Sequence, residues 1–168
     1  MFLINSGKRW ELSCSFEDRR LPREAGFNWD NNLKVWYTKD IEIARKFRMH
    51  TAKEYYKINK GLKSRRDLSK VIFVYYKMFF RSNKSATQII MDAIVEVSNR
   101  CDGAVMDDCE GFNSYDVSRA DDILSTGINS SGEAASAFMM VYKYRKQLSN
   151  SVLNRMNNIR KFALCLDL

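Results

Sequence analysis

The stretch FNWDNNLKVWYT at residues 27–38 constrains the fold of this chain most, because it predicts two short strands joined by a tight turn. Asp30, Asn31 and Asn32 are residue types that favour turns, and aromatic and β-branched side chains flank them on both sides. A second stretch, WELSCSFE at residues 10–17, alternates apolar and polar side chains as a half-buried strand does. The first part of the chain is therefore predicted to contain a small sheet.

The aromatic side chains of this hairpin could form the core of a small domain or a surface on which bases stack. A domain of about 60 residues buries little surface and needs most of its aromatic rings inside. Strand alternation also separates Trp36 from its neighbour Tyr37. We therefore expect Phe27, Trp29 and Tyr37 to pack in the core. Trp36 and Lys34 are then the exposed pair available to a ligand.

One long helix is predicted to follow the hairpin, in KDIEIARKFRMHTAKEYYKI at residues 39–58, with Thr38 as its N-cap. Its basic groups recur at helical spacing and form a line along one face, beside Arg45 and Arg48. Such a line of almost purely positive groups indicates a surface that faces phosphate. We name this set the basic line; its members are Lys39, Lys46, His50, Lys53, Lys57 and Lys60.

The pattern becomes helical after the polar, basic segment NKGLKSRR at residues 59–66, which is the best candidate for a domain boundary. A buried helix is predicted in DLSKVIFVYYKMFF, with a strand as the less favoured alternative because Val, Ile, Tyr and Phe also favour sheet. Capping boxes begin at Ser85 and Ser130. The second box opens a helix predicted at about 132–148, and another helix is predicted at 150–164.

These patterns predict an α+β fold in two domains. The first is a basic β-hairpin/strand plus helix module at residues 1–60, and the second is a mainly α-helical domain at residues 67–168. An irregular segment rich in Asp and Glu, the acidic loop at residues 102–122, interrupts the second domain.

A core-facing stripe of the helix at 132–148 runs through Arg145, and a buried guanidinium needs a partner. Asp116 in the acidic loop, or a neighbouring acid, can supply that partner, and we expect a structural ion pair between Asp116 and Arg145. Lys143 and Lys146 lie on the outer side of the same helix, where they could meet phosphate.

The charge is spread unevenly along the chain. The formal net charge is +8, and residues 1–80 hold 18 Lys or Arg against 9 Asp or Glu, whereas residues 81–168 hold 10 against 11. The whole basic excess therefore lies in the first half, which indicates that this half meets a polyanion such as nucleic acid.

Several classes of protein are disfavoured by the sequence. The four cysteines form no CxxC pair and there is one histidine, so no zinc site is expected, and the thiols are expected to be reduced. There is no phosphate-binding GxxxxGK[ST] loop and no GxSxG, so we expect neither an enzyme nor a cofactor or metal. The chain shows no signal peptide and no membrane-spanning run, which predicts a cytoplasmic protein.

Two sets of short motifs carry a resemblance. The first set is Ala25, Gly26, Phe27, Trp29, Asp30, Lys34, Trp36 and Tyr37, and the second is Asp102, Gly103, Gly111, Phe112, Asn113, Asp116, Lys143, Tyr144, Arg145, Gln147 and Leu148. The first half resembles the HARP-like hairpin modules of Swi/Snf-type helicases and of phage or plasmid replication proteins, and the second half resembles another helicase-associated helical segment. The resemblance covers most of residues 10–150, although the chain lacks a helicase motor, and it implies a stand-alone accessory module in DNA transactions.

Three functions remain open at this point. The leading prediction is a non-enzymatic nucleic-acid-binding accessory protein of phage or mobile-element origin, which binds DNA rather than RNA and acts in replication, recombination or repair, alone or with a helicase. The alternative is an inhibitor or adaptor that binds a host nucleic-acid machine. The third is a metal-dependent nuclease that uses the acidic loop.

Overall fold

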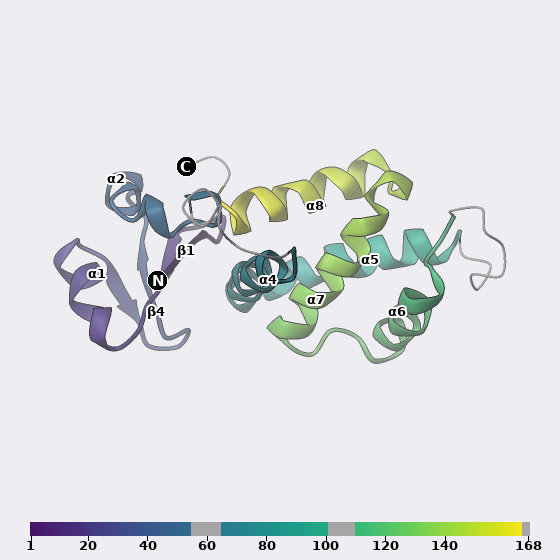
Figure 1. The fold of residues 1–168 in the computed structure, drawn as a ribbon, viewed down its shortest axis with the longest axis horizontal. Helices are drawn as coiled ribbons and strands as arrows, with labels where there is room; N and C mark the ends of the chain where they lie inside the picture. The colour runs from purple at the N-terminus through teal and green to yellow at the C-terminus, as the bar shows by residue number, and fades with distance from the viewer. Residues whose placement is uncertain (55–64, 101–109, 166–168) are drawn as a thin grey trace. The chain divides into compact units, whose positions relative to one another are not determined.

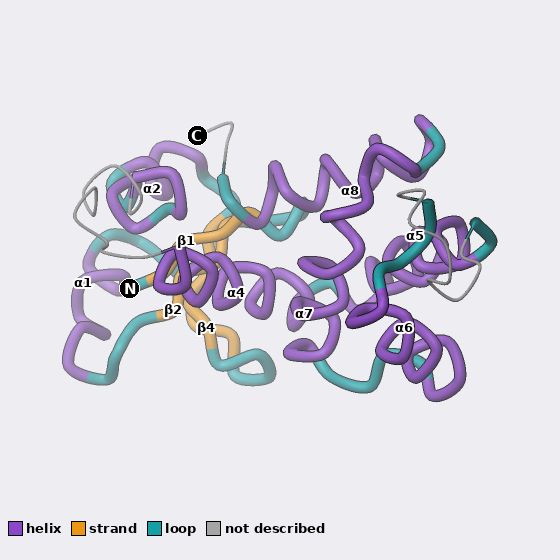
Figure 2. The backbone as a smooth tube through the Cα atoms, turned by 45° about the vertical axis from the view of Figure 1, so that its right-hand side comes forward, coloured by secondary structure: helices purple, strands orange, loops and turns teal. Residues whose placement is uncertain are grey.

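The computed structural model of this protein describes residues 1–54, 65–100 and 110–165 and shows an α+β fold (Figure 1). A small antiparallel sheet occupies the N-terminal part of the chain, and helices follow it (Figure 2). The predicted fold class is therefore confirmed. None of the helices in the described ranges is long and apolar enough to cross a membrane.

The chain forms two compact units, which we call the sheet unit and the helical unit. The sheet unit consists of Met1–Ser82 together with Arg160–Leu168, and the helical unit of Asn83–Ile159. This division differs from the boundary predicted at residues 59–66. The helix that follows this segment, α4 (Arg65–Ser82), belongs to the sheet unit.

The sheet has four strands in the order β1-β2-β4-β3, all antiparallel to their neighbours. The predicted hairpin is confirmed as β3 and β4, whereas β1 was not predicted. A left-handed glycine, Gly7 with φ 83°, lies in the turn between β1 and β2. The strands are β1 (Phe2–Asn5), β2 (Trp10–Ser13), β3 (Asn28–Asp30) and β4 (Val35–Thr38).

One face of the sheet carries the core of the sheet unit. Cross-strand pairing places Leu3 opposite Leu12, Leu12 opposite Trp36, and Trp36 opposite Trp29, so the four side chains form one row on this face. Leu3 and Leu12 are fully buried, and Phe27 and Phe47 complete the core with their rings edge to face, 5.2 Å between centroids.

The other face of the sheet packs against α4. The ring of Tyr75 meets the ring of Phe2 edge to face at 5.5 Å between centroids, and its hydroxyl donates to the carbonyl oxygen of His50 at 2.8 Å. At the end of the helix, the Ser82 hydroxyl donates to the buried carboxylate of Glu11 in β2. Both faces of the small sheet are therefore covered, although sequence reasoning expected one module of about 60 residues.

The prediction of a single long helix after β4 is wrong. The chain instead forms α2 (Ile41–Arg45), the 3₁₀ turn η2 (Arg48–His50), and a new helical turn at residues 52–54. Between η2 and this last turn, the backbone of Thr51 is extended (φ −75°, ψ 156°), and this interrupts the helix. Its buried hydroxyl accepts the backbone N–H of Glu54 at 3.2 Å, so it caps the turn that follows.

The helical unit is built from helices and 3₁₀ turns, and Ile94, Phe138 and Met156 are fully buried in it. Residues 114–126 of the chain, which overlap the predicted acidic loop, form a helix, so that part of the loop prediction is wrong. Residues 101–109 lie outside the described residues. The elements are η3 (Lys84–Ala86), α5 (Thr87–Ser98), α6 (Ser114–Thr126), α7 (Ser131–Val141), η4 (Tyr142–Gln147) and α8 (Asn150–Ala163), whose last residues enter the sheet unit.

The helix caps agree with the sequence only in part. Ser130 caps α7 as predicted, since its hydroxyl accepts the N–H of Glu133 at 3.1 Å. Ser85 caps no helix, because it lies within η3 and α5 begins after it. In the sheet unit Asp40 replaces the predicted Thr38 as the N-cap of α2, with its carboxylate accepting from Glu42.

Candidate nucleic-acid interface

The basic line is not one helical face, because the helix that was predicted to carry it is broken. The backbone changes direction at Thr51, and helical spacing no longer relates the residues before it to those after it. The members are now placed separately: Lys39 precedes α2, Lys46 follows it, His50 ends η2, Lys53 lies in the next turn, and Lys57 and Lys60 lie outside the described residues.

Three lysines near the hairpin and α2 remain available to a ligand. Lys34, Lys39 and Lys46 are exposed, and none has an acidic partner among the residues that the structure describes. Lys34 lies in the β3–β4 loop with left-handed backbone, φ 55°. An exposed ammonium without a carboxylate neighbour is suited to a phosphate of the nucleic-acid backbone.

The two arginines predicted beside the basic line are both engaged. Arg45 donates to Glu42 at 2.5 Å on the same face of α2. Arg48 pairs with Glu54 at 3.3 Å across the break in the helix. These acids offset part of the positive charge, so the two arginines are weaker candidates for phosphate than the three lysines.

His50 contributes little positive charge at neutral pH. Burial lowers the pKa of its imidazole below the ordinary value, and the charge of the N-terminus lowers it further. The half-buried ring lies beside Phe47, 6.0 Å between centroids. A neutral imidazole cannot act as one of the cations of the predicted basic line.

The predicted roles of the hairpin tryptophans are reversed. Trp29 is 43% exposed, whereas Trp36 is half-buried against the core. Phe27 is buried as expected, and Tyr37 is half-buried under the Arg9 guanidinium, 4.2 Å from its ring centroid. Alternation correctly separated Trp36 from Tyr37. The exposed position is Trp29, because β3 is the edge strand and ends the row of side chains on the core face.

A groove of about 760 Å³ opens where this row of side chains ends. The rings of Trp29 and Trp36 form one wall, 5.2 Å between centroids. Phe16, 75% exposed, also lines the groove, and the guanidinium of Arg19 lies over its ring, 3.6 Å from the centroid. We name this feature the aromatic groove; its lining is Cys14, Ser15, Phe16, Arg19, Arg23, Phe27, Asn28, Trp29 and Trp36.

Local sequence explains how the groove is built. Its second wall is the segment after β2, with the 3₁₀ turn η1 (Glu17–Arg19) and α1 (Arg20–Glu24). Gly26, with φ 96°, reverses the chain after α1, and the carbonyl of Pro22 accepts the N–H of Phe27 at 2.9 Å. These short elements leave the end of the core face uncovered.

The exposed indole of Trp29 is held in place. Its Nε1–H donates to the side-chain oxygen of Asn31 at 3.0 Å. Asp30 shapes the same loop by accepting the backbone N–H of Asn32 at 2.9 Å and of Leu33 at 3.0 Å. The Arg9 guanidinium donates to the Asp30 carboxylate at 2.6 Å and so links the loop to the turn between β1 and β2. The ring therefore presents a fixed surface to the groove.

The Cys14 thiol in the groove is not set up as a nucleophile. Burial raises its pKa above the ordinary value, and the charge of Asp18 raises it further. The thiol is therefore protonated at neutral pH, whereas catalytic cysteines need a lowered pKa. Among the described residues, no cluster of three or more His, Cys, Asp or Glu could hold a metal ion. Three of the seven carboxylates of the proposed nuclease loop, Asp102, Asp107 and Asp108, lie outside these residues.

The predicted pairing of Asp116 with Arg145 is wrong. The buried carboxylate of Asp116 accepts from Lys143 at 2.9 Å and from the hydroxyl of Tyr144 at 2.7 Å. Arg145 is exposed and donates to a carbonyl of the preceding turn at 3.3 Å. The cause is η4, Tyr142–Gln147, because a 3₁₀ helix has about three residues per turn and a stripe spaced for an α-helix loses its register there.

The helical unit offers fewer cations to a ligand than predicted. Lys143 is occupied by Asp116, although its side chain is 59% exposed. Lys146 is exposed and has no acidic partner within the described part of the chain. The predicted phosphate contact in this unit is thus reduced to Lys146.

Sequence reasoning missed Phe16, Arg19, Arg23 and the exposed position of Trp29. One signal was present: the segment SFEDRRLPRE places an aromatic residue and arginines directly before the hairpin. Only the folded structure shows that these residues line one groove with Trp29.

Comparison with known proteins adds no relative. No protein-family model, curated protein or solved structure matches the chain. The resemblance to helicase-associated modules therefore stays a prediction from short motifs.

Proposed function

We propose that this protein is a non-enzymatic nucleic-acid-binding module that contacts the phosphate backbone through its sheet unit. The observation that carries the proposal is the group of exposed lysines, Lys34, Lys39 and Lys46, without acidic partners among the described residues. They lie in the half of the chain that holds the whole basic excess. Such contacts position a protein on nucleic acid without reading its sequence.

The proposed role is accessory and cytoplasmic, in DNA replication, recombination or repair, and the motif resemblance is its support. Binding through lysine–phosphate contacts releases counterions, so affinity should fall steeply with salt and depend little on sequence. The chain offers an internal comparison, because the helical unit also carries exposed cations, and these are not part of the proposed surface.

The test is fluorescence anisotropy with labelled DNA and RNA oligonucleotides across a series of salt concentrations. The double variant Lys39→Gln/Lys46→Gln should weaken binding of all sequences alike and reduce the slope of log K against log salt by roughly one per lysine. The charge-matched control is Lys84→Gln/Arg100→Gln in the helical unit, which should leave the slope unchanged. The proposal fails if no nucleic acid binds at low salt, or if the two double variants behave alike.

A second candidate, an inhibitor or adaptor that docks on a host nucleic-acid machine, is favoured by two exposed apolar side chains. Ile41 is 41% exposed and Met49 is 59% exposed, close in sequence to the exposed lysines. A protein partner would bury these side chains, whereas a phosphate backbone would not. Stoichiometric capture of one protein from nuclease-treated lysate, lost in Ile41→Ser/Met49→Ser, would support this function over the first.

A further inference from the structure

The aromatic groove combines features that together select one kind of ligand. Trp29 and Phe16 expose 43% and 75% of their surface, although a small domain has few large apolar side chains to spare from its core. The rings of Trp29 and Trp36 lie against each other, and Arg19 covers the ring of Phe16. A flat aromatic ligand can stack in such a groove and cover these rings.

The arginines of the groove add a requirement for negative charge. Arg19 and Arg23 line the groove, and neither pairs with an acid among the described residues. Arg20, which does not line it, pairs with Glu24 at 3.3 Å. Asp18 of η1 accepts a hydrogen bond from the Ser15 hydroxyl at 2.9 Å. Two guanidinium groups without acidic partners beside aromatic rings match a base that carries a phosphate.

We propose that the aromatic groove binds an unpaired base of single-stranded nucleic acid, stacked on Trp29, with the adjoining phosphate at Arg19 and Arg23. This proposal rests on the proposed function and gives it a preference for single strands. A duplex keeps its bases stacked on each other and offers a side chain only their edges. The groove volume of about 760 Å³ falls within the usual range for small-ligand sites.

A proline-rich peptide is the competing ligand, because aromatic grooves also bind polyproline helices. Arg19 and Arg23, which have no acidic partner among the described residues, favour the nucleotide, since a neutral proline-rich segment offers neither a negative charge. A peptide therefore enters the experiment as an outcome that overturns the proposal.

The experiment measures the affinity of the full chain by anisotropy, at one salt concentration, for three labelled probes. These are a dT12 single strand, a matched duplex, and a single strand of the same length whose central nucleotides are abasic. Trp29→Ala should weaken dT12 binding by about 5- to 150-fold, the loss expected for one stacked base. Duplex binding should be unchanged, and the abasic strand should bind the unmodified protein more weakly than dT12.

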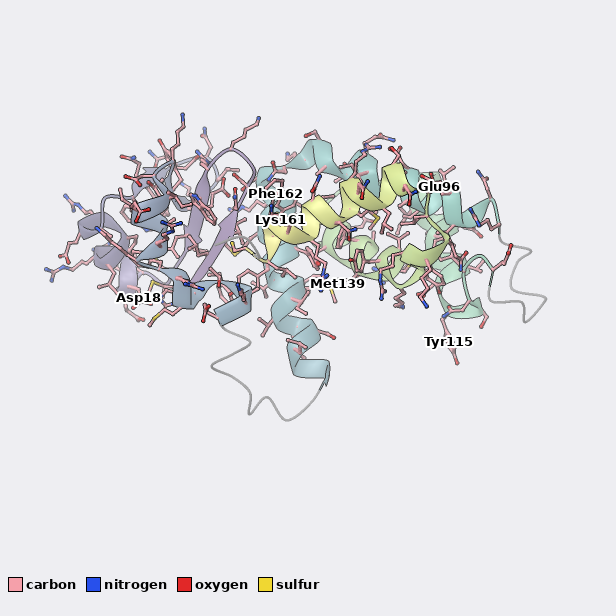
Figure 3. The ribbon with its side chains drawn as sticks, turned by 90° about the horizontal axis from the view of Figure 1, so that it is seen from above. Asp18, Glu96, Tyr115, Met139, Lys161 and Phe162 are labelled. Carbon is pink, nitrogen blue, oxygen red and sulfur yellow. The ribbon has the colours of Figure 1, made fainter. Side chains whose placement is uncertain are left out.

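Two controls separate stacking from damage to the fold. Trp29→Phe keeps a ring and should restore most of the dT12 affinity. Tyr115→Ala removes a 90% exposed ring from α6 that points away from its helix (Figure 3), and it should change nothing. For the charges, Arg19→Gln/Arg23→Gln should weaken dT12 more than the single variant Arg20→Gln does.

The outcomes separate this proposal from the proposed function. If every oligonucleotide fails to bind at low salt, the proposed function itself fails. If oligonucleotides bind, but Trp29→Ala has no more effect than Tyr115→Ala or weakens duplex and single strand alike, only the groove proposal is overturned. Quenching of tryptophan fluorescence by a polyproline peptide, with none by dT12, overturns it as well.

Discussion

At the scale of single residues, Asp30 is the side chain that holds the hairpin to the sheet. Its carboxylate accepts backbone N–H groups of the loop and an Arg9 guanidinium group at 2.6 Å. Arg9 also donates to the buried carboxylate of Glu11 at 2.9 Å. The loop that positions Trp29 therefore depends on a charge that can be titrated.

The pKa of Asp30 is lowered, first by the hydrogen bond from the Leu33 N–H and then by Arg9. The stability this gives is complete above the unfolded pKa of about 3.9 and is lost as pH falls through the lower folded value. Asp30→Asn should therefore destabilise the sheet unit at pH 6, and its difference from the unmodified protein should shrink towards pH 3. Urea unfolding followed by tryptophan fluorescence reports this unit, because Trp10, Trp29 and Trp36 all lie in it. A difference that stays constant with pH would contradict the assignment.

The sequence predicted the alternation of side chains around the hairpin tryptophans but not which of the two tryptophans is exposed. Alternation placed Trp36 on the opposite side from Tyr37, and the structure confirms this. The alternation of side chains along a strand does not show which face of the sheet is exposed to solvent, because that depends on what packs against each face. Here α4 covers one face, and the other is covered only as far as Trp36, which leaves Trp29 exposed at the edge.

At the scale of elements, local signals predicted the hairpin and most helices but not the breaks between them. Ile41, Ala44 and Phe47 have helical spacing, yet the backbone at Phe47 (φ −106°, ψ 19°) leaves the helix. Its ring packs on Phe27, a residue twenty positions earlier. Tertiary packing therefore outweighs helix propensity at this position, as it often does for short helices.

The contact between α6 and η4 gives a test of the corrected ion pair. Asp116 is 10% exposed, whereas Lys143 is 59% exposed, so the hydrogen bond from Tyr144 should contribute more than the lysine does. Asp116→Ala should cost about 2 kcal/mol of unfolding free energy, and Lys143→Ala less than about 1 kcal/mol. Arg145→Ala, an exposed control, should stay within about 0.5 kcal/mol.

The measurement is chemical denaturation of the helical unit, followed by amide hydrogen exchange of α6 and η4. A loss in Arg145→Ala equal to the loss in Asp116→Ala would restore the pairing that the sequence suggested. Equal losses in Asp116→Ala and Lys143→Ala would mean that the ion pair, and not the Tyr144 hydroxyl, holds the contact.

At the scale of the whole molecule, the chain returns to the sheet from positions far along the sequence. α4 covers the second face, and the C-terminal segment closes the first, where the buried Cys165 thiol donates to the carbonyl oxygen of Leu3 at 3.4 Å. Local sequence patterns do not predict such contacts, because the residues that meet lie far apart in the sequence and belong to different elements. The module predicted at residues 1–60 therefore omitted α4 and the C-terminal segment, which cover the two faces of the sheet.

This difference can be tested with fragments. In a fragment of residues 1–60, the fully buried Ile4 and the carboxylate of Glu11 would face water where α4 packs in the full chain. Burial of these groups is part of what offsets the entropy of ordering so small a sheet. We expect this fragment to show no cooperative thermal transition by circular dichroism or tryptophan fluorescence.

A longer fragment of residues 1–82 restores Tyr75 and Ser82 on the second face, and it should unfold cooperatively at a lower temperature than the full chain. It still lacks Cys165, so the first face remains partly open and some stability is missing. A cooperative transition in the 1–60 fragment would show that the hairpin module is self-sufficient. In that case α4 and the C-terminal segment would be additions to a complete fold, and the boundary at residues 59–66 would be the true one.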